Sequence, residues 1–195
     1  MRKKEDFYLQ LITPNHPITM IPDKKDLVPA IAGFPDILME RCAASALQSL
    51  LKEISAFDQI VPVSGFRTQK EQQDIWDMAL KEHGLLYTKQ YVAIPGCSEH
   101  QSGLAIDLAW KKEDIDFICP DFPEDGICGE FRKLAPKYGF ILRYPKDKEA
   151  ITHISYEPWH FRYVGIPHAQ NITRQHMVLE EYIALHSYSK VCIVL

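Results

Sequence analysis

The stretch from Ser98 to Trp110 reads SEHQSGLAIDLAW and places a histidine and an aspartate within an apolar surrounding. His100 lies seven residues before Asp107, and Asp107 interrupts the run LAIDLAW, whose other residues predict a buried strand. Burial of a carboxylate without a partner costs several kcal/mol. The pair therefore either forms a structural hydrogen bond or binds a metal ion, and the spacing alone leaves both interpretations open.

A second histidine with a carboxylate neighbour follows in the segment EPWH at 157–160. Catalytic zinc sites typically have three protein ligands and keep a fourth position for water. His100, Asp107 and His160 would supply two imidazoles and one carboxylate. Glu157 would remain free as a general base for water whose pKa the metal lowers to about 7. The alternative for each histidine is a hydrogen-bonded core residue, since eight histidines in one chain make chance pairs common.

The spacing within EPWH limits its conformation. Glu157 and His160 are three residues apart, so a regular strand would direct them to opposite faces. Pro158 excludes the interior of a helix, and we therefore expect a turn or bulge there if both side chains reach one site. The other histidines have no motif around them and are predicted not to bind metal: His16, His83, His153, His168, His176 and His186.

The segment GFRT at 65–68 follows a predicted strand and begins a helix, because Thr68 and Glu71 match a capping box. Arg67 therefore lies at the end of a strand. A guanidinium there could stabilise the oxyanion that forms when water adds to a peptide carbonyl. The alternative is a surface arginine that pairs with Glu71 or Asp74, and the segment taken by itself favours that alternative.

Composition and charge exclude several classes of protein. With 195 residues, 46% of them hydrophobic and 25% charged, the chain is expected to form one globular domain. The net charge of −4, without a basic block among aromatics, argues against nucleic-acid binding. No apolar run approaches the ~20 residues of a transmembrane helix. Glu5 and Asp6 follow the basic start in place of an apolar region, which predicts a cytoplasmic protein without a signal peptide.

The cysteines and the C-terminal residues indicate neither a disulfide framework nor a membrane-spanning segment. Five cysteines, an odd number without a C-x-x-C pair, indicate reduced thiols rather than disulfides or a zinc ribbon. The closing VCIVL is too short to span a bilayer. The sequence indicates neither the oligomeric state nor whether VCIVL contacts a membrane.

Predicted helices and strands alternate irregularly, which favours an α+β architecture over a doubly wound sheet. Residues 1–35 are rich in proline and are expected to be extended or turn-rich. The predicted helices are one that Asp36 caps, one from Thr68 to near Gly84, a short one over FRKLAPKY at 131–138, and one from Thr173 to near His186. The predicted strands cover 59–65, 91–96, 104–110, 139–145 and 153–165, the last two as a hairpin. The acidic segment 111–130 is expected to be a loop, either a lid or, more commonly, a solvated surface loop.

Taken together, three motifs resemble those of the zinc-dependent D,D-peptidases of vancomycin resistance, the VanX, VanY and VanXY types. They are GFRTQKEQ at 65–72, Ser98-x-His100-x-x-Gly103-x-Ala105-x-Asp107, and Glu157-x-x-His160. The likeness reaches beyond the motifs, since LLYTKQYVAIPGCSEHQSGLAID at 85–107 is similar to the VanXY type in particular. It covers most of the chain, roughly from Asn15 to the final helix.

The resemblance implies the hedgehog/D,D-peptidase fold, an α+β fold with a central antiparallel sheet and flanking helices. It also implies one Zn²⁺ per chain, because His100, Asp107 and His160 match the family's metal ligands. Glu157 matches its catalytic base and Arg67 its carbonyl-polarising arginine. The implied substrates are peptides that end in D-Ala-D-Ala, either the free dipeptide or the peptidoglycan precursor, and their removal would deprive vancomycin of its target.

The resemblance also implies substrate contacts, since Ser98 and Gln72 match positions that help to hold substrate. Trp159 is expected to form the wall of the pocket. A free dipeptide carries an ammonium group close to the scissile bond and calls for a nearby acid, but Ser64, directly before Gly65, is neutral. We therefore expect longer precursor-like substrates to be favoured over free D-Ala-D-Ala.

Two rival functions are compatible with such a fold. Related folds hold zinc in binding modules, so a non-catalytic protein that recognises cell-wall peptides or another protein is one alternative. Glu157 and Arg67 favour the enzyme, because a binding module needs neither a base beside an open zinc position nor an oxyanion partner. An L,D- or endopeptidase is the other alternative, and the motifs do not separate it from a D,D-peptidase.

Overall fold

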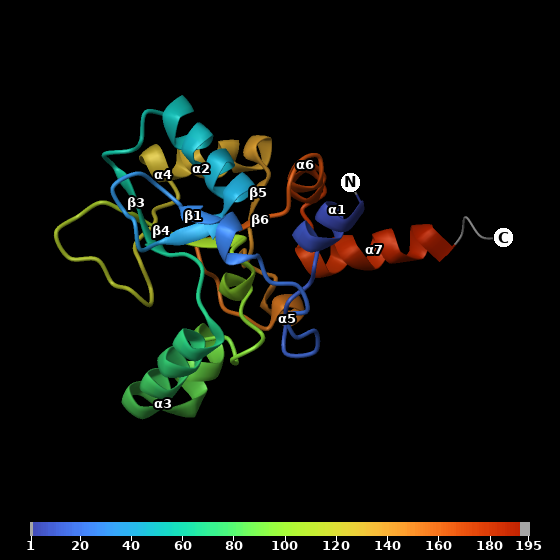
Figure 1. Cartoon of the computed structure of the whole chain (residues 1–195), viewed down its shortest axis with the longest axis horizontal. Helices are drawn as coiled ribbons and strands as arrows, with labels where there is room; N and C mark the ends of the chain where they lie inside the picture. Colours follow the sequence, from blue (N-terminus) through green and yellow to red (C-terminus); the bar gives the residue numbers. More distant parts are fainter. Residues whose placement is uncertain (1, 192–195) are drawn as a thin grey trace.

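Four antiparallel strands form the central sheet of the computed structural model, which describes residues 2–191 (Figure 1). Across the sheet the strands follow the order β3–β4–β6–β5, with the bounds β3 Ile60–Ser64, β4 Ala105–Trp110, β6 His160–Tyr163 and β5 Phe140–Leu142. A separate pair joins β1 (Leu27–Pro29) and β2 (Leu38–Glu40). The antiparallel sheet and its helices confirm the predicted α+β class.

The two faces of β4 serve different purposes. Ile106 and Leu108 belong to the main hydrophobic core, together with Leu47 and Phe131 from two covering helices. Each fully buried side chain of this kind contributes about 1.5–3 kcal/mol. Because side chains alternate along a strand, Asp107 lies on the opposite face. The apolar face thus anchors the strand and leaves the other face to polar residues.

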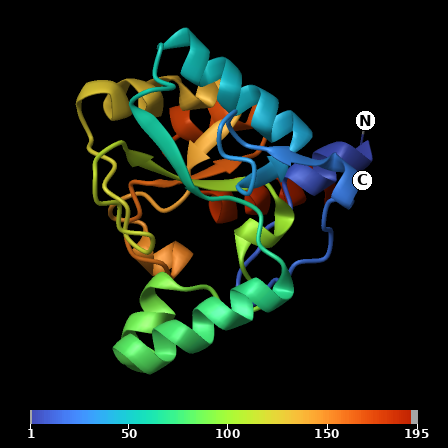
Figure 2. The ribbon, with the colours of Figure 1, turned by 60° about the vertical axis from the view of Figure 1, so that its left-hand side comes forward.

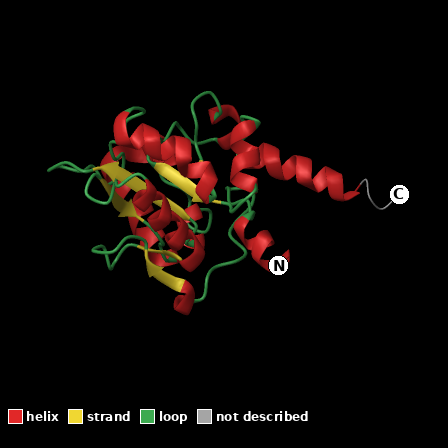
Figure 3. Ribbon diagram, turned by 90° about the horizontal axis from the view of Figure 1, so that it is seen from above, coloured by secondary structure: helices red, strands yellow, loops and turns green. Residues whose placement is uncertain are grey.

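Helices lie on both sides of the sheet, as Figure 2 shows. The helices α2 (Arg41–Glu53) and α4 (Gly126–Leu134) cover the apolar face, and α3 (Gln69–Tyr91) lies on the opposite side. A second, smaller core packs α6 (His168–Arg174) and α7 (Leu179–Val191) against the end of the sheet, and α7 extends away from it (Figure 3). The remaining helices are α1 (Arg2–Tyr8), α5 (Glu149–Thr152), and the 3-10 helices η1 (Lys24–Asp26), η2 (Glu99–Ser102) and η3 (Ala135–Tyr138).

The start of α2 differs from the prediction that Asp36 caps it. Residues 38–40 instead pair with β1, and the helix begins after them. The Glu40 carboxylate accepts hydrogen bonds from the backbone N–H groups of Cys42 (2.8 Å) and Ala43 (3.1 Å), so it takes the capping role. The predicted apolar face of this helix is confirmed, since its members are buried: Leu47, Leu50, Leu51 and Ile54.

The predicted capping box is confirmed, because Thr68 and Glu71 exchange side chain to backbone hydrogen bonds at the start of α3. The helix that begins at Thr68 ends near Gly84, as predicted, and α3 consists of two helical segments. Gly84 adopts a φ of 79° and kinks the chain, after which the helix resumes and ends at Tyr91. The segment 91–96 is therefore not a strand.

Other boundaries also differ. Thr173 lies inside α6 instead of capping the last helix, because the chain turns at His176, whose φ is 51°. Residues 1–35 include α1, and the last residues of the predicted loop 111–130 belong to α4. Of the predicted strand 153–165, only β6 pairs in the sheet, although its pairing with β5 is confirmed.

Among residues 2–191, no helix combines the length and apolar character that crossing a bilayer requires. The described cysteines have free thiols, as predicted: Cys42, Cys97, Cys119 and Cys128. Cys192 and the rest of the apolar chain end lie outside the described residues.

Candidate active site

The register of the sheet brings Asp107 of β4 beside His160 of β6. Asp107 is paired directly with His160 on one side and with Ser64 of β3 on the other. Side chains of directly paired residues leave the same face of a sheet, and His160 Nδ1 lies 2.9 Å from Asp107 Oδ1. Strand pairing therefore joins two motifs that are about fifty residues apart in the sequence.

His100 reaches the same point from η2. The chain leaves η2 through Gly103, whose φ is 68°, and a Cβ atom there would lie 3.2 Å from the backbone nitrogen of Glu40. Glycine adopts this conformation without a steric penalty, which explains the glycine between the histidine and the aspartate. His100 Nδ1 lies 2.7 Å from the carbonyl oxygen of Gly65 and donates to it, so that Nε2 faces Asp107 Oδ2 at 3.1 Å.

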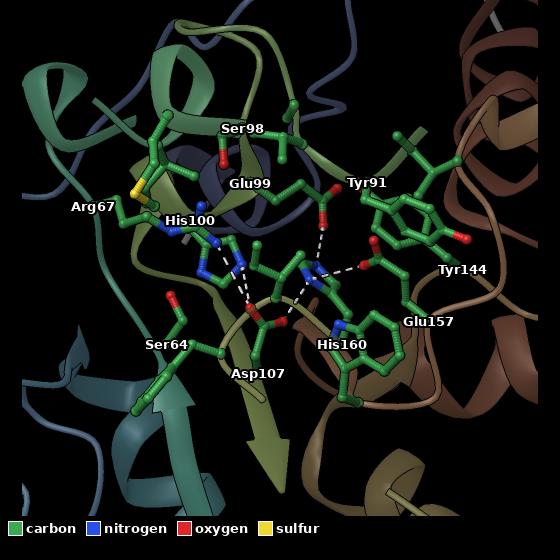
Figure 4. Close-up of a pocket in the computed structure, with 18 residues that line it drawn as sticks. Ser64, Arg67, Tyr91, Ser98, Glu99, His100, Asp107, Tyr144, Glu157 and His160 are labelled. Carbon is green, nitrogen blue, oxygen red and sulfur yellow. Dashed lines mark ion pairs between the residues drawn. The ribbon is translucent and has the colours of Figure 1, made fainter. Parts of the chain in front are cut away.

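These three side chains form a buried donor set (Figure 4). One ligand atom from each of His100, Asp107 and His160 lies within 4.8 Å of the others. Oδ1 of Asp107 is buried without a hydrogen-bond partner among the described residues, whereas buried polar side-chain atoms usually have one. Two imidazoles and one carboxylate are ligands that catalytic zinc takes. The residues present therefore fit a zinc ion.

The segment EPWH turns at Pro158, as the sequence predicted. The backbone N–H of His160 donates a 3.3 Å hydrogen bond to the carbonyl of Glu157, which closes the turn. The Glu157 carboxylate consequently points toward the His160 ring, with 3.6 Å between Oε2 and Nδ1 (Figure 4). Glu157 thus stands beside the donor set.

Arg67 lies over the site instead of pairing with Glu71 or Asp74. Its Nη2 lies 3.6 Å from Asp107 Oδ2, and its Nη1 donates a 2.9 Å hydrogen bond to the Gln72 side chain. The Gln72 amide nitrogen in turn donates to a backbone carbonyl at 2.8 Å. Gln72 is fully buried and fixes the direction of Arg67, while its predicted contact with substrate stays a prediction.

A pocket opens over the donor set and combines polar and apolar walls. Three predicted substrate residues line it, namely Ser64, Ser98 and Trp159. Phe117 and Ile118 from the acidic loop line it as well, and Phe117 is 79% exposed. Two side chains of the acidic loop therefore reach the pocket, and the lid stays a prediction.

Burial and neighbouring charges separate the pKa values of the site. Burial, assisted by the Arg67 charge, lowers the pKa of His100 to about 4. Burial raises the pKa of Glu157 to about 8, and the negative charge of Asp107 adds to the effect. Burial opposes the charged form of His160, but the Asp107 carboxylate outweighs it and raises the pKa to about 9. The two histidines likewise overcome burial to hold the pKa of Asp107 below its usual range.

Two groups at the site were missed by the sequence analysis. The carboxylate of Glu99 is fully buried next to His160, and the ring of Tyr144 packs 5.0 Å from the His160 ring. Arg143 and Arg162, inside predicted strands, bind the Glu99 carboxylate. Charged residues in apolar strands need buried partners, and this signal could have found the cluster.

Comparison with known proteins defines the class of this site. The family model of VanY, D-alanyl-D-alanine carboxypeptidase, matches residues 36–166. The chain belongs to this family. A curated relative, the bifunctional D-Ala-D-Ala dipeptidase and D-Ala-D-Ala carboxypeptidase VanXYC of Enterococcus gallinarum, is 50% identical over 181 residues, which cover 92% of this chain and 94% of the relative.

Solved structures of related enzymes have the same fold. The D,D-dipeptidase VanXYg in complex with a D-Ala-D-Ala phosphinate analogue superposes with a TM-score of 0.88 at 52% identity, covering 93% of this chain and 73% of that one. The LdcB LD-carboxypeptidase gives a TM-score of 0.77 at 33% identity, covering 94% and 88%. A VanY D,D-pentapeptidase mutant in complex with Zn(II) gives 0.70 at 32% identity, covering 91% and 99%.

Proposed function

We propose that this chain is a zinc-dependent D,D-peptidase that removes the C-terminal D-Ala from peptides ending in D-Ala-D-Ala and thereby confers vancomycin resistance. One observation carries the proposal: a buried set of two imidazoles and a carboxylate lies beside a free carboxylate and a guanidinium in a single pocket. A non-catalytic binding module has no use for the last two groups.

His100, Asp107 and His160 would hold the zinc ion, in keeping with the Zn(II) complex of the related VanY mutant. When bound, zinc polarises the scissile carbonyl and lowers the pKa of water toward about 7. The hydrogen bond from His100 Nδ1 to the carbonyl of Gly65 fixes this ring with Nε2 toward the site. His100 is neutral at pH 7, as a ligand must be.

Glu157 acts as the general base in this proposal. Its carboxylate takes a proton from the attacking water and later passes it to the nitrogen of the leaving D-Ala. Burial raises the pKa of this carboxyl group, which makes its ionised form a stronger base than an exposed glutamate.

Arg67 stabilises the negative charge that develops on the carbonyl oxygen. Its guanidinium lines the pocket, and the hydrogen bond to Gln72 fixes its direction. A charged donor held in place before the reaction pays no reorganisation cost as the oxyanion forms. Ser98 and Trp159 also line the pocket. In this proposal Ser98 donates a hydrogen bond to the C-terminal carboxylate of the substrate, and Trp159 forms a wall.

The neutral Ser64 is expected to limit turnover of the free dipeptide. It lines the pocket, and its strand neighbour Asp107 is committed to the donor set. In a Ser64→Asp variant, the added carboxylate would attract the dipeptide ammonium, so kcat/KM for D-Ala-D-Ala should rise relative to that for a pentapeptide. A Ser64→Asn variant is the control, because asparagine has nearly the same size as aspartate but carries no charge. An unchanged ratio in the aspartate variant would show that Ser64 does not set the preference.

Zinc binding is expected to release protons. In the metal-free protein at pH 7, His160 is charged because its pKa is raised to about 9, whereas a ligand imidazole must be neutral. At least about one proton per zinc ion should leave, and the apparent affinity should rise about tenfold per pH unit below pH 9. Calorimetric titrations with zinc in buffers of different ionisation enthalpy measure the release. An affinity that is constant between pH 6 and 8 would contradict this prediction.

Release of D-Ala by the zinc-loaded protein tests the proposed function. The substrates are D-Ala-D-Ala, a pentapeptide ending in D-Ala-D-Ala, and the tetrapeptide that lacks the last D-Ala. Release from either of the first two supports the proposal, and their ratio separates dipeptidase from carboxypeptidase. Release from the tetrapeptide alone would assign an L,D-carboxypeptidase, and no release by zinc-loaded protein would favour a binding module.

Three further expectations belong to this proposal. We propose that residues 1–195 act as a single catalytic domain and that the loop at 111–125 closes over bound substrate, because two of its side chains line the pocket. The cytoplasm is the proposed location, which cell fractionation tests.

A further inference from the structure

The mechanism above leaves one buried carboxylate at the site without a use. Glu99 lies on η2, directly before His100, and its side chain is 0% exposed. Arg143 Nε donates a 2.8 Å hydrogen bond to Glu99 Oε1, and Arg162 Nη1 lies 2.9 Å from the same oxygen. The two arginines therefore hold the Glu99 carboxylate in one orientation.

The second oxygen of Glu99 faces a metal-site histidine. Glu99 Oε2 lies 3.6 Å from His160 Nε2, and neither atom has a hydrogen-bond partner among the described residues. On its other side, the same ring directs Nδ1 toward Asp107 Oδ1, at 2.9 Å. Figure 4 shows the ring between the two carboxylates, with one nitrogen toward each.

The distance of 3.6 Å is longer than a hydrogen bond, and zinc would shorten it. Two zinc ligands with bonds of about 2.0–2.1 Å in tetrahedral geometry lie about 3.3 Å apart. The gap between His160 Nδ1 and Asp107 Oδ1 is smaller, at 2.9 Å. Binding of the ion would therefore favour a shift of the His160 ring away from Asp107. Such a shift would bring Nε2 closer to Glu99 Oε2.

We propose that Glu99 is a positioning residue for His160: its Oε2 accepts the Nε2 proton, which fixes the tautomer whose Nδ1 is free to bind the metal. This inference rests on the proposed zinc site. It adds which nitrogen of His160 binds the ion and which residue holds the His160 ring. Metal-bound histidines commonly donate their second N–H to a carboxylate, and loss of that partner typically costs 10–100-fold in metal affinity or activity. Glu99 itself touches neither substrate nor reacting atoms.

A Glu99→Gln variant tests the role of the charge. The arginines require an acceptor at Oε1, so the side-chain oxygen of glutamine stays with them and its NH₂ group faces His160. The NH₂ group of the glutamine and the Nε2–H group of His160 would then face each other as two donors. This repulsion disfavours the Nε2–H tautomer of His160. The zinc affinity, measured in competition with a chelating dye, should fall 10–100-fold.

Glu180 provides a matched control within the same charge network. It binds the other side of Arg143, with 2.9 Å and 2.7 Å to the two Nη atoms. Among the described residues, Arg143 is what links Glu180 to Glu99 and the donor set. A Glu180→Gln variant also removes one negative charge beside Arg143, yet it should keep the zinc affinity of the unaltered protein. Equal losses in the two variants would overturn the proposal and assign Glu99 to charge balance alone.

Nitrogen-15 and proton NMR of the unaltered, zinc-loaded protein gives a second test that needs no variant. The His160 ring should show a protonated, hydrogen-bonded Nε2 and a metal-bound Nδ1. A ring with a protonated Nδ1 and a metal-bound Nε2 would overturn the proposal. Both tests measure metal binding and not D-Ala release. They therefore support or overturn the role of Glu99 even if the protein has no peptidase activity.

Discussion

Replacement of Glu157 by alanine is expected to lower kcat for D-Ala release by about 10²–10⁴-fold, the usual contribution of a general acid–base group. Zinc should stay bound, because the three predicted ligand side chains remain. In the structure Glu157 is the carboxylate beside the donor set that has no arginine partner within ion-pair distance among the described residues. Its loss leaves no group to take the proton from water.

The measurement compares kcat and zinc content for Glu157→Ala and a matched Glu113→Ala variant. Glu113 is an exposed carboxylate on the acidic loop, so its removal should leave both quantities unchanged. A Glu157→Ala protein that keeps its zinc and turns over substrate at the unaltered rate would exclude Glu157 as the base.

Replacement of Asp107 by asparagine should remove both zinc and activity. Asp107 stands at the centre of the donor set, with its two oxygens at 3.1 Å from His100 and 2.9 Å from His160. A neutral amide is a poor zinc ligand, so the donor set would lose its one negatively charged member. We expect the zinc affinity to fall by more than the ~100-fold upper limit of changes outside the ligand set.

Asp121→Asn is the matched control for this change. Asp121 is an exposed aspartate that pairs with Lys112 at 3.4 Å, so loss of its charge should leave the zinc content unaltered. Zinc content by atomic absorption and D-Ala release are measured on both proteins. An Asp107→Asn protein with a full zinc complement would contradict the assignment of Asp107 as a ligand.

The sequence predicted the donor set because its residues break local rules. Asp107 in an apolar strand and Pro158 between Glu157 and His160 each require a specific structural solution, namely a buried partner and a turn. The capping box at Thr68 was predicted for a similar reason, since its hydrogen bonds are local. Other local patterns failed, since the caps expected at Asp36 and Thr173 do not form.

Features that depend on tertiary contacts were not predicted. The start of α2 moved from Asp36 because residues 38–40 pair with a strand that the sequence did not indicate. The hydrogen bond from Arg67 to the Gln72 side chain was also not predicted, because it depends on how α3 packs beside the site. Glu99 lies directly before His100 but was not identified, because its two arginine partners lie 44 and 63 residues further along the chain.

One titration tests whether His100, Asp107 and His160 hold a single catalytic zinc ion. Zinc is added to the metal-free protein, and the release of D-Ala from a pentapeptide ending in D-Ala-D-Ala is measured. With His100, Asp107 and His160 as the ligands of one catalytic ion, activity should be absent without zinc, rise linearly with added zinc and level off at one equivalent per chain. Activity that persists in the metal-free protein would contradict the account. So would a protein that binds one equivalent of zinc and releases no D-Ala.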